Sequence, residues 1–497
     1  MTENKKTTSE KELNKKTSAG EAKAITPIAV DYPQWYQDVI VAADLSENAP
    51  VRGCMIIKPY GYAIWEMIQT VLNAKIKAIG VKNAYFPLFI PSSFLQREAE
   101  HVEGFSPQVA VVTIGGGKQL EEPLIVRPTS ETIIYDAYSR WIQSYRDLPM
   151  LINQWANVVR WETRPRAFLR TTEFLWQEGH TAHATAKEAT DYALMILNTV
   201  YKTFLEEYLA APVITGRKSE GEKFPGAGDT FTMEAVMQDG KALQMGTAHD
   251  LSDHFAKSFG IKFLDKDGQT KYAYNSSWGV TTRLIGAIIM MHGDDKGLVL
   301  PPKIAPVQAV VLPIAKEGDL ETVAKAKEAV AGLMTDFRIE IDARDNLRLG
   351  EKHYEWEKKG VPVRIEIGPK DLANQSCVLV RRDTGVKQIV ALKDLKAELT
   401  KLLEEIQKNI FAKAEARVSE HTKSADTWAE FEKAIEQGYV MSFWCEDGKC
   451  EEQIKEKTKA VTRCLPFNAK EESGEHVCVH CGKPVKVNKR WAFARSY

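Results

Sequence analysis

Hydrophobic residues recur with a helical period early in the chain. In residues 62–80 the apolar positions are spaced three and four apart, which is typical of an amphipathic helix. We expect this helix to end at Gly80, because glycine readily adopts the backbone conformation that terminates helices. The apolar run 85–91 follows and contains two prolines, which suit the edge of a sheet. The pattern therefore predicts a long helix followed by an edge strand.

Strand patterns dominate the middle of the chain. Residues 151–162 and 168–178 are two strand-like runs separated by a polar connection with a proline, and they predict an antiparallel hairpin. Residues 243–247 and 272–280 predict further strands, and residues 282–291 are apolar enough for a buried helix. An α+β domain with an antiparallel sheet and flanking helices accommodates all of these elements.

The pattern changes after Pro301 and Pro302. Short apolar strands then alternate with amphipathic helices at residues 307–314, 321–336, 338–342, 352–359, 361–367 and 377–381. This alternation predicts an α/β domain with a mixed sheet, and a charged helix at about residues 393–417 leads to a final small domain. We expect a tail at residues 1–25, a catalytic-type domain at 26–303, the α/β domain at 304–410 and a C-terminal α+β domain at 411–497.

Composition and charge narrow the class of protein. The 66 Lys and Arg residues nearly balance the 67 Asp and Glu residues, so any RNA contact must come from a local basic patch. The first 24 residues are charged and nearly free of large apolar side chains, which predicts disorder and excludes a signal peptide. The most apolar stretch, residues 297–315, is broken by prolines and Lys303. We therefore predict a cytoplasmic protein without a membrane span.

A dense group of polar and aromatic residues lies in the expected hairpin. Arg160 and Glu162 should project from one strand, with Arg170 and Phe174 on the return strand. Arginine binds phosphate with two parallel hydrogen bonds, glutamate can accept from an adenine amino group, and phenylalanine can stack on the base. These residue types suit a nucleotide, although surface ion pairs beside a core aromatic ring would give the same local pattern.

Two flanking segments favour the nucleotide interpretation. Arg-Pro-Thr-Ser-Glu-Thr occupies residues 127–132, and Ser-Trp-Gly-Val-Thr-Thr-Arg occupies residues 277–283. With these segments in this order, the chain resembles class II aminoacyl-tRNA synthetases, and within them the prolyl enzymes of the archaeal and eukaryotic type. Residues 80–87 look like motif 1, residues 160–174 like motif 2, and the segment ending at Arg283 like motif 3. The resemblance extends from about Asp31 to Tyr497.

The resemblance implies a homodimeric ligase that uses proline, ATP with Mg²⁺, and tRNA(Pro). It first forms prolyl-adenylate and then esterifies the tRNA 3′ end. Arg160 and Arg283 would act in catalysis. The implied ATP-binding residues are Arg160, Glu162, Arg170, Thr171, Phe174, Gln244, Thr247, Thr281 and Arg283. The implied proline-binding residues are Phe105, Thr129, Glu131, Arg160, Trp176 and His249.

Alternatives remain for two of the proline-site residues, and one family feature is expected to be missing. Glu131 could instead stabilise a helix N-terminus, and a lone histidine such as His249 is often structural. Some prolyl enzymes carry an editing domain between motifs 2 and 3. Here residues 180–278 are already occupied by core elements, so we predict no editing domain.

Cysteines cluster near the end of the chain. Of seven cysteines, five lie in residues 445–497. Cys445 and Cys450 enclose four residues, and Cys478 and Cys481 enclose two, which is good spacing for a structural zinc site with four thiolates. The alternative is reduced, uncoordinated cysteine. Cys464 has no such spacing and is expected to be packed.

The resemblance also covers the later domains. The α/β domain is similar to the family's anticodon-binding module, where basic residues near Arg344, Arg348 and Lys352 either contact tRNA or form a solvated helix face. The last residues, 491–497, resemble a terminus that folds back toward the active site. Two rival interpretations are a synthetase-like RNA-binding or regulatory protein without catalysis, and a zinc-dependent RNA-binding module.

Overall fold

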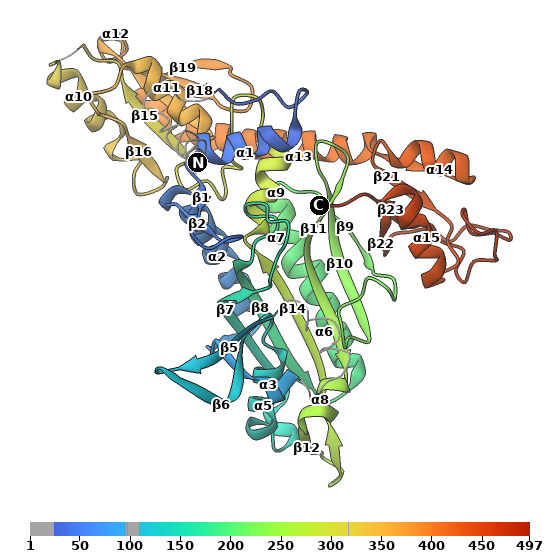
Figure 1. The fold of residues 1–497 in the computed structure, drawn as a ribbon. Helices are drawn as coiled ribbons and strands as arrows, with labels where there is room; N and C mark the ends of the chain where they lie inside the picture. The colour runs from blue at the N-terminus through green and yellow to red at the C-terminus, as the bar shows by residue number, and fades with distance from the viewer. Residues whose placement is uncertain (1–23, 96, 98–108, 317) are drawn as a thin grey trace, which may run out of the picture.

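The computed structural model describes residues 24–95, 97, 109–316 and 318–497. Nearly all of the expected N-terminal tail lies outside these residues. The chain forms a central body built on one large sheet, with an α/β domain at one end and a small C-terminal domain on the opposite side (Figure 1). Among the described residues, no helix is both long and apolar enough to cross a membrane.

The central sheet has eleven strands in the order β20-β21-β23-β22-β9-β10-β11-β14-β8-β7-β3. Its strands are β3 (Lys82–Asn83), β7 (Met150–Val159), β8 (Glu173–His183), β9 (Ile214–Arg217), β10 (Asp229–Val236), β11 (Ala242–Ser252), β14 (Tyr274–Thr281), β20 (Thr422–Ser424), β21 (Tyr439–Ser442), β22 (Val461–Pro466) and β23 (Trp491–Ala494). Neighbours are antiparallel except β3 with β7 and β20 with β21. The predicted antiparallel sheet is thus confirmed, and β7 with β8 forms the predicted hairpin.

Helices pack on one face of this sheet and enclose the main core. They include α1 (Tyr32–Ala42), α2 (Pro59–Ala78), α6 (Ala186–Met195), the π-helix η3 (Ile196–Tyr201), α7 (Lys202–Glu207) and α9 (Arg283–His292). The predicted amphipathic stripe is buried, with Ile68 and Leu72 of α2 fully inside. Gly80 follows α2 with a φ of +86°, as expected for a residue that ends a helix. Helix α2 confirms the helix predicted from periodicity, and α9 confirms the buried helix predicted from its apolar content.

Smaller elements surround the edge at β3. A three-stranded sheet contains β4 (Phe89–Pro91), β5 (Ala110–Gly115) and β6 (Lys118–Val126). Nearby lie α3 (Ser92–Leu95), α5 (Glu131–Trp141), η2 (Tyr145–Asp147), α8 (His254–Phe259), and the pair β12 (Lys262–Leu264) and β13 (Thr270–Tyr272). The pair β1 (Ser46–Asn48) and β2 (Met55–Ile57) precedes α2. The apolar run 85–91 is therefore extended over only part of its length.

The α/β domain has a mixed five-stranded sheet, as predicted, in the order β16-β15-β17-β18-β19. Its elements are β15 (Ala309–Pro313), α10 (Leu320–Ala331), β16 (Ile339–Ile341), α11 (Leu349–Lys358), β17 (Val363–Ile367), α12 (Pro369–Ala373), β18 (Ser376–Arg381), β19 (Lys387–Ala391), η4 (Leu392–Asp394) and α13 (Leu395–Glu420). Helix α13 is the predicted charged helix, and it runs across the boundary expected at residue 410.

The C-terminal domain continues the central sheet. It contains α14 (Trp428–Ile435) and α15 (Gly448–Thr458) together with β20 to β23, and β22 pairs directly with β9. The close approach requires glycine at position 216, because a Cβ there would lie 2.4 Å from the Leu465 carbonyl oxygen. The expected small domain therefore shares its sheet with the catalytic-type domain.

Candidate functional site

A cavity of about 590 Å³ opens on the polar face of the central sheet. Strands β8, β10, β11 and β14 form its floor. Because side chains alternate between the two faces of a strand, every second residue points toward the cavity. The opposite face carries Ala248, Trp278 and Val280 into the helix-covered core.

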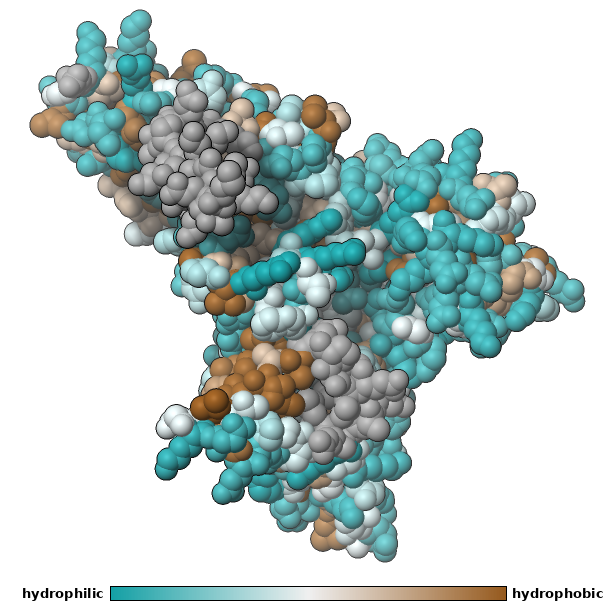
Figure 2. Space-filling view, in the orientation of Figure 1, coloured by the Kyte–Doolittle hydropathy of each residue, from teal (hydrophilic) through white to brown (hydrophobic). Residues whose placement is uncertain are grey.

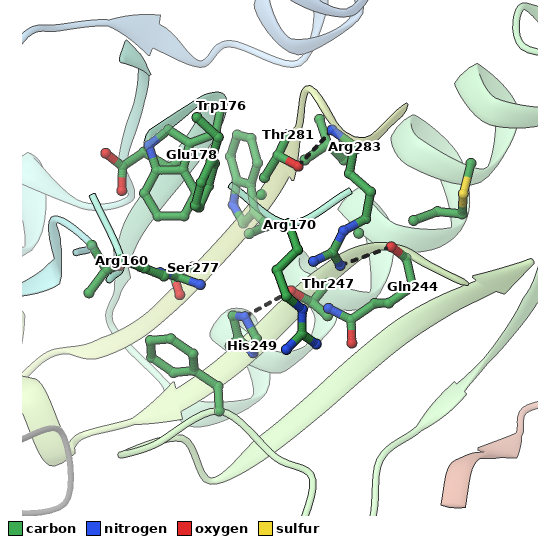
Figure 3. A pocket seen from close by; sticks show the side chains of 18 of the residues that line it. Arg160, Arg170, Trp176, Glu178, Gln244, Thr247, His249, Ser277, Thr281 and Arg283 are labelled. Atoms are coloured by element: carbon green, nitrogen blue, oxygen red, sulfur yellow. Dashed lines mark hydrogen bonds between the residues drawn. The ribbon is translucent and has the colours of Figure 1, made fainter. Parts of the chain in front are cut away.

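The strand register explains which side chains meet on this floor. His249 of β11 is opposite Ser277 of β14, which in turn is opposite His180 of β8. In the next row on this face, Thr247 and Glu178 lie on either side of Gly279. The absence of a side chain at Gly279 leaves room between these two polar groups. Figure 3 shows the labelled side chains around the cavity.

The connection between β7 and β8 forms one wall. We expected Arg160, Glu162 and Arg170 on strands, and that placement is wrong, since β7 ends at Val159 and β8 begins at Glu173. The two ends of the connection nevertheless lie side by side, because the Arg160 N–H donates to the Thr172 carbonyl over 2.8 Å. The three side chains therefore still line the cavity.

Arg160 is partly buried and packs against two aromatic rings. Its guanidinium carbon lies 5.6 Å from the Phe174 ring centroid and 5.5 Å from that of Trp176, and its Nε donates to the Pro128 carbonyl over 2.9 Å. Burial lowers the pKa of Arg160, and Glu131 and Glu178 oppose this shift. The arrangement gives a cation of fixed orientation in the middle of the cavity.

A buried carboxylate network borders Arg160. Glu178 accepts from Ser130 Oγ at 2.6 Å and from Gln154 Nε2 at 2.7 Å, and its second oxygen is 2.9 Å from His180 Nε2. Burial tends to lower the pKa of His180, but Glu178 and Glu131 together outweigh this and the pKa is raised. Glu131 is the first residue of α5 and accepts from the Thr129 hydroxyl. The two predictions for Glu131 are thus compatible, since it begins a helix and also lines the cavity.

His249 is held between two hydroxyl groups. Its Nδ1 lies 3.0 Å from Thr230 Oγ1 and its Nε2 lies 3.0 Å from Thr247 Oγ1. The Phe224 ring packs on the imidazole with centroids 4.5 Å apart. Burial lowers the pKa of His249 to about 3, so the ring is neutral at physiological pH. His249 is therefore both hydrogen-bonded structurally and part of the cavity wall.

Arg283 lies at the other end of the floor. Its Nε donates to the Leu169 carbonyl at 3.2 Å. Its Nη1 donates to the Gln244 carbonyl at 3.3 Å, as Figure 3 shows. Burial lowers its pKa to about 10, so it remains a cation at neutral pH. Arg170 is more exposed and lies 3.7 Å from Glu162, which is the ion pair that the alternative interpretation expected.

Every predicted proline-binding or ATP-binding residue that the structure describes lines this one cavity, Thr171 and Thr281 included. Phe105 lies outside the described residues. Sequence reasoning missed Lys218, Glu222, Phe224, Glu178, His180 and Ser277, which also line it. Glu178 and His180 follow Trp176 at spacings of two and four, so extending the strand alternation would have found them. Among the described residues, Ser277 Oγ and His180 Nδ1 are buried without a hydrogen-bond partner.

The four predicted cysteines meet in the C-terminal domain. Cys445, Cys450, Cys478 and Cys481 place their sulfur atoms within 4.8 Å of one another. The shortest pairs are Cys450 with Cys478 at 3.6 Å and Cys445 with Cys481 at 3.5 Å. Tetrahedral Zn–S bonds of 2.3 Å require sulfur separations of about 3.8 Å, so this set fits zinc. Cys464 is buried outside the cluster, as expected.

Two of the three basic residues suggested for the α/β domain are engaged within the protein, and the third, Arg348, is exposed. Arg344 donates to both oxygens of Asp342 at 2.8 and 2.6 Å, and Lys352 is buried. A smaller cavity of about 170 Å³ lies elsewhere in this domain. Its lining includes the cationic residues Lys296, Arg364, Arg381, Arg382 and Lys387.

Three family models match successive parts of the chain. The tRNA synthetase class II core domain (G, H, P, S and T) matches residues 113–292, the anticodon binding domain matches residues 308–402, and the model described as Prolyl-tRNA synthetase, C-terminal matches residues 428–497.

Full-length relatives agree with these models. A Proline--tRNA ligase from Alkaliphilus oremlandii is 53% identical over 466 residues, covering 93% of this chain and 96% of that protein. One from Natranaerobius thermophilus is 52% identical over 478 residues, covering 96% and 98%. The chain belongs to the prolyl-tRNA synthetase family. Another Proline--tRNA ligase, from Porphyromonas gingivalis, is 51% identical over 499 residues, covering 96% of this chain and all of that protein.

For this prolyl-tRNA synthetase family member, the large cavity falls mainly within the class II core. The predicted proline-binding and ATP-binding residues in the described part of the chain all lie between residues 129 and 283, inside the matched core segment. The sulfur cluster lies inside the matched C-terminal segment. The resemblance inferred from the sequence is therefore confirmed, and the α+β core, the α/β domain and the small C-terminal domain are all present.

Proposed function

We propose that this cavity carries out the proline–tRNA ligase reaction. Proline and ATP would form prolyl-adenylate with release of diphosphate, and the prolyl group would then pass to the 3′ end of tRNA(Pro). The observation that carries the proposal is the position of Arg160. Its guanidinium lies between a pocket that suits an ammonium group, at Glu131 and Glu178, and the cationic end at Arg283.

The first step needs orientation and charge more than proton transfer. The proline carboxylate is already ionised at neutral pH, so it can attack the α-phosphorus without a general base. Arg160 would hold the carboxylate and the α-phosphate together, and Arg283 would bind the γ-phosphate. Arg170 would bind the phosphate tail, while Glu162 and Phe174 would hold adenine, with Thr171, Gln244, Thr247 and Thr281 completing the ATP site. Mg²⁺ would enter on the ATP phosphates and share their charge.

The amino-acid end suits a secondary ammonium group. Thr129 and Glu131 would accept its two N–H groups, because their oxygens lie together at the start of α5. Trp176 and the neutral His249 would form walls around the ring, with Phe105 as a further contact. A neutral histidine avoids repulsion of the ammonium, and its lowered pKa supports this role.

Amino-acid selection would depend on this pocket alone. The residues between β8 and β14 form η3, α6, α7 and strands β9 to β13, all of which belong to the core of the body or its edge. We therefore propose a chain without an editing domain between motifs 2 and 3. Van der Waals contact discriminates one methylene by only about 1–3 kcal/mol, so some activation of alanine or cysteine is expected.

The sulfur cluster would hold a structural Zn²⁺. Four thiolates fill a tetrahedral shell and leave no position for a reactive water. In this role the four thiolates would cross-link α15 and the residues just before it, which carry Cys450 and Cys445, to the loop before β23, which carries Cys478 and Cys481. These segments lie around a small apolar core. The metal would therefore support the fold and take no part in the chemistry.

The chain would act as a homodimer in the cytoplasm. A hydrophobic patch lies beside β5 and β6 (Figure 2), where Val111 and Ile114 are 53% and 61% exposed. Tyr85 and Phe89, which lie in or next to the segment resembling motif 1, are exposed as well. Large exposed apolar patches are typical of protein interfaces. Sedimentation of the chain with Val111→Glu and Ile114→Glu should show monomers if this surface forms the dimer.

The tRNA would bind to a local surface of the protein, because the net charge of the whole chain is close to zero. The smaller cavity of the α/β domain has an apolar floor at Trp356 and Val361, which suits an unstacked base, and each cation of its lining is paired with a carboxylate of the protein, as Arg382 is with Asp294. We propose it as an anticodon contact in place of Arg344 and Lys352.

Proline-dependent exchange of labelled pyrophosphate into ATP tests the proposed reaction directly. Exchange with proline, strongly reduced with alanine, cysteine and histidine, is the expected result. If the folded protein with Mg²⁺ shows no proline-dependent exchange, the catalytic proposal is wrong, and a synthetase-like RNA-binding or regulatory protein becomes the better explanation.

A further inference from the structure

One wall of the large cavity is held in place by contacts with the C-terminal domain. Residues 217–224, which we call the lip segment, begin at the end of β9 and pass between the cavity and the C-terminal domain. Lys218, Glu222 and Phe224 of this segment line the cavity. The position of the lip segment therefore affects the shape of the cavity.

The lip segment contacts the end of the cavity that we propose binds proline. The Phe224 ring packs on His249, and the Phe224 N–H donates to Thr230 Oγ1 at 2.9 Å. The same hydroxyl lies 3.0 Å from His249 Nδ1. A displacement of the lip segment would thus move Phe224 and loosen the hydrogen bonding that orients His249.

The other side of the lip segment is fixed by the C-terminal domain. Ser219 Oγ donates to Glu451 Oε1 at 3.0 Å and lies 2.9 Å from Thr462 Oγ1, which also donates to Glu451. All three side chains are buried. A Cβ at Gly221 would lie 3.0 Å from Glu451 Oε2, so the packing at this point is tight.

A buried ion network makes a second attachment. Arg463 of β22 donates from Nε and Nη2 to Glu234 Oε2 at 3.0 and 2.7 Å. The Lys218 ammonium lies 3.8 Å from Glu234 Oε1 and 4.0 Å from Glu222. Since a buried carboxylate is stabilised by its partners, Arg463 influences where the Lys218 side chain is held.

We propose that Thr462, Glu451 and Arg463 of the C-terminal domain are positioning residues for the proline site. They act through the lip segment, and they set the placement of Phe224 against His249. The proposal rests on the proposed function, because it assumes that His249 borders bound proline. It assigns the C-terminal domain a part in substrate recognition in addition to its structural role.

The decisive variant is Thr462→Val, which keeps the side-chain shape and removes one buried hydroxyl. We expect KM for proline in pyrophosphate exchange to rise about fivefold, the effect of one buried hydrogen bond. KM for ATP should stay unchanged, because within the described part of the chain no hydrogen bond joins Arg283 or Phe174 to the lip segment. Thr462→Ser, which restores the hydroxyl, should return KM for proline to near the wild-type value.

Ser442→Ala is the matched control. Ser442 is also a buried hydroxyl of the C-terminal domain, but it donates to the Ala425 carbonyl, away from the lip segment. It should lower the melting temperature without raising KM for proline. The proposal is overturned if Thr462→Val leaves KM for proline unchanged, raises both KM values equally, or has no larger effect than Ser442→Ala.

Hydrogen exchange tests, without any measurement of catalysis, whether Thr462 holds the lip segment in place. Thr462→Val should increase exchange in peptides covering residues 217–224, and Ser442→Ala should not. Unchanged exchange in Thr462→Val overturns the positioning role whether or not the protein is active. Absence of proline-dependent exchange of pyrophosphate in the wild type overturns the proposed function instead, so the two failures can be told apart.

Discussion

Arg160→Lys probes the point at which the proposed proline and ATP sites meet. Lysine keeps the positive charge but loses the planar fork that fits a carboxylate and a phosphate together. It also loses the Nε hydrogen bond to Pro128 and the stacking between Phe174 and Trp176 that fixes the arginine. The variant therefore separates charge from geometry.

The expected loss follows from the contacts. A hydrogen bond to a charged group contributes about 1.5–3 kcal/mol, which corresponds to a fall of about 10- to 150-fold in kcat/KM. Proline-dependent pyrophosphate exchange measures this directly. Arg170→Lys is the control, because that side chain is 55% exposed and its replacement should cost about tenfold or less. A kcat/KM for Arg160→Lys within about threefold of wild type would show that charge alone suffices and would refute the reasoning.

Three further changes test other parts of the molecule. Cys478→Ser should reduce zinc measured by elemental analysis and lower the melting temperature, and an unchanged zinc content would contradict the proposed metal site. Gly216→Val places a side chain against the Leu465 carbonyl, so limited proteolysis should release the C-terminal domain, and an unaltered digest would argue against the close packing. Burial lowers the folded pKa of His292 to about 4, below the unfolded value of about 6.5, so stability should be constant above pH 6.5 and fall as pH drops toward 4. His292→Gln, which can still donate to the Leu209 carbonyl, should reduce that slope in urea titrations by up to about 1.4 kcal/mol per pH unit, and an identical slope would rule out this histidine as its source.

Local periodicity predicted the elements whose burial pattern is regular. Helix α2 and the β7–β8 hairpin follow from repeated apolar positions, because the core covers one face of each, whereas α9 follows from its continuous apolar run, because Leu284 to Met291 are all buried. Within the connection from Arg160 to Thr172, residues 160–162 and 168–172 are predicted as strand but lie outside β7 and β8. Its ends are extended and paired by one backbone hydrogen bond, so its sequence looks like a continuation of the hairpin.

Contacts between distant segments left no local signal. The four cysteines could be found because the two pairs have metal-ligand spacing, and the nucleotide residues because their order is distinctive. Lys218 and Phe224 have neither property. They reach the cavity because backbone hydrogen bonds tie them to Thr230 of β10, and because β9 also pairs with β22, more than two hundred residues later in the chain, as the Leu465–Arg217 register shows.

The strand order of the central sheet also has a consequence during synthesis on the ribosome. Strand β9 emerges long before β22, and until the last part of the chain is made its outer edge has no neighbour from the C-terminal domain. An unpaired strand edge readily pairs with other chains, and such distant pairing is slow to form. Nascent chains and chains cut short before residue 461 should therefore aggregate through β9, and its short length and Gly216 limit how much of that edge is available.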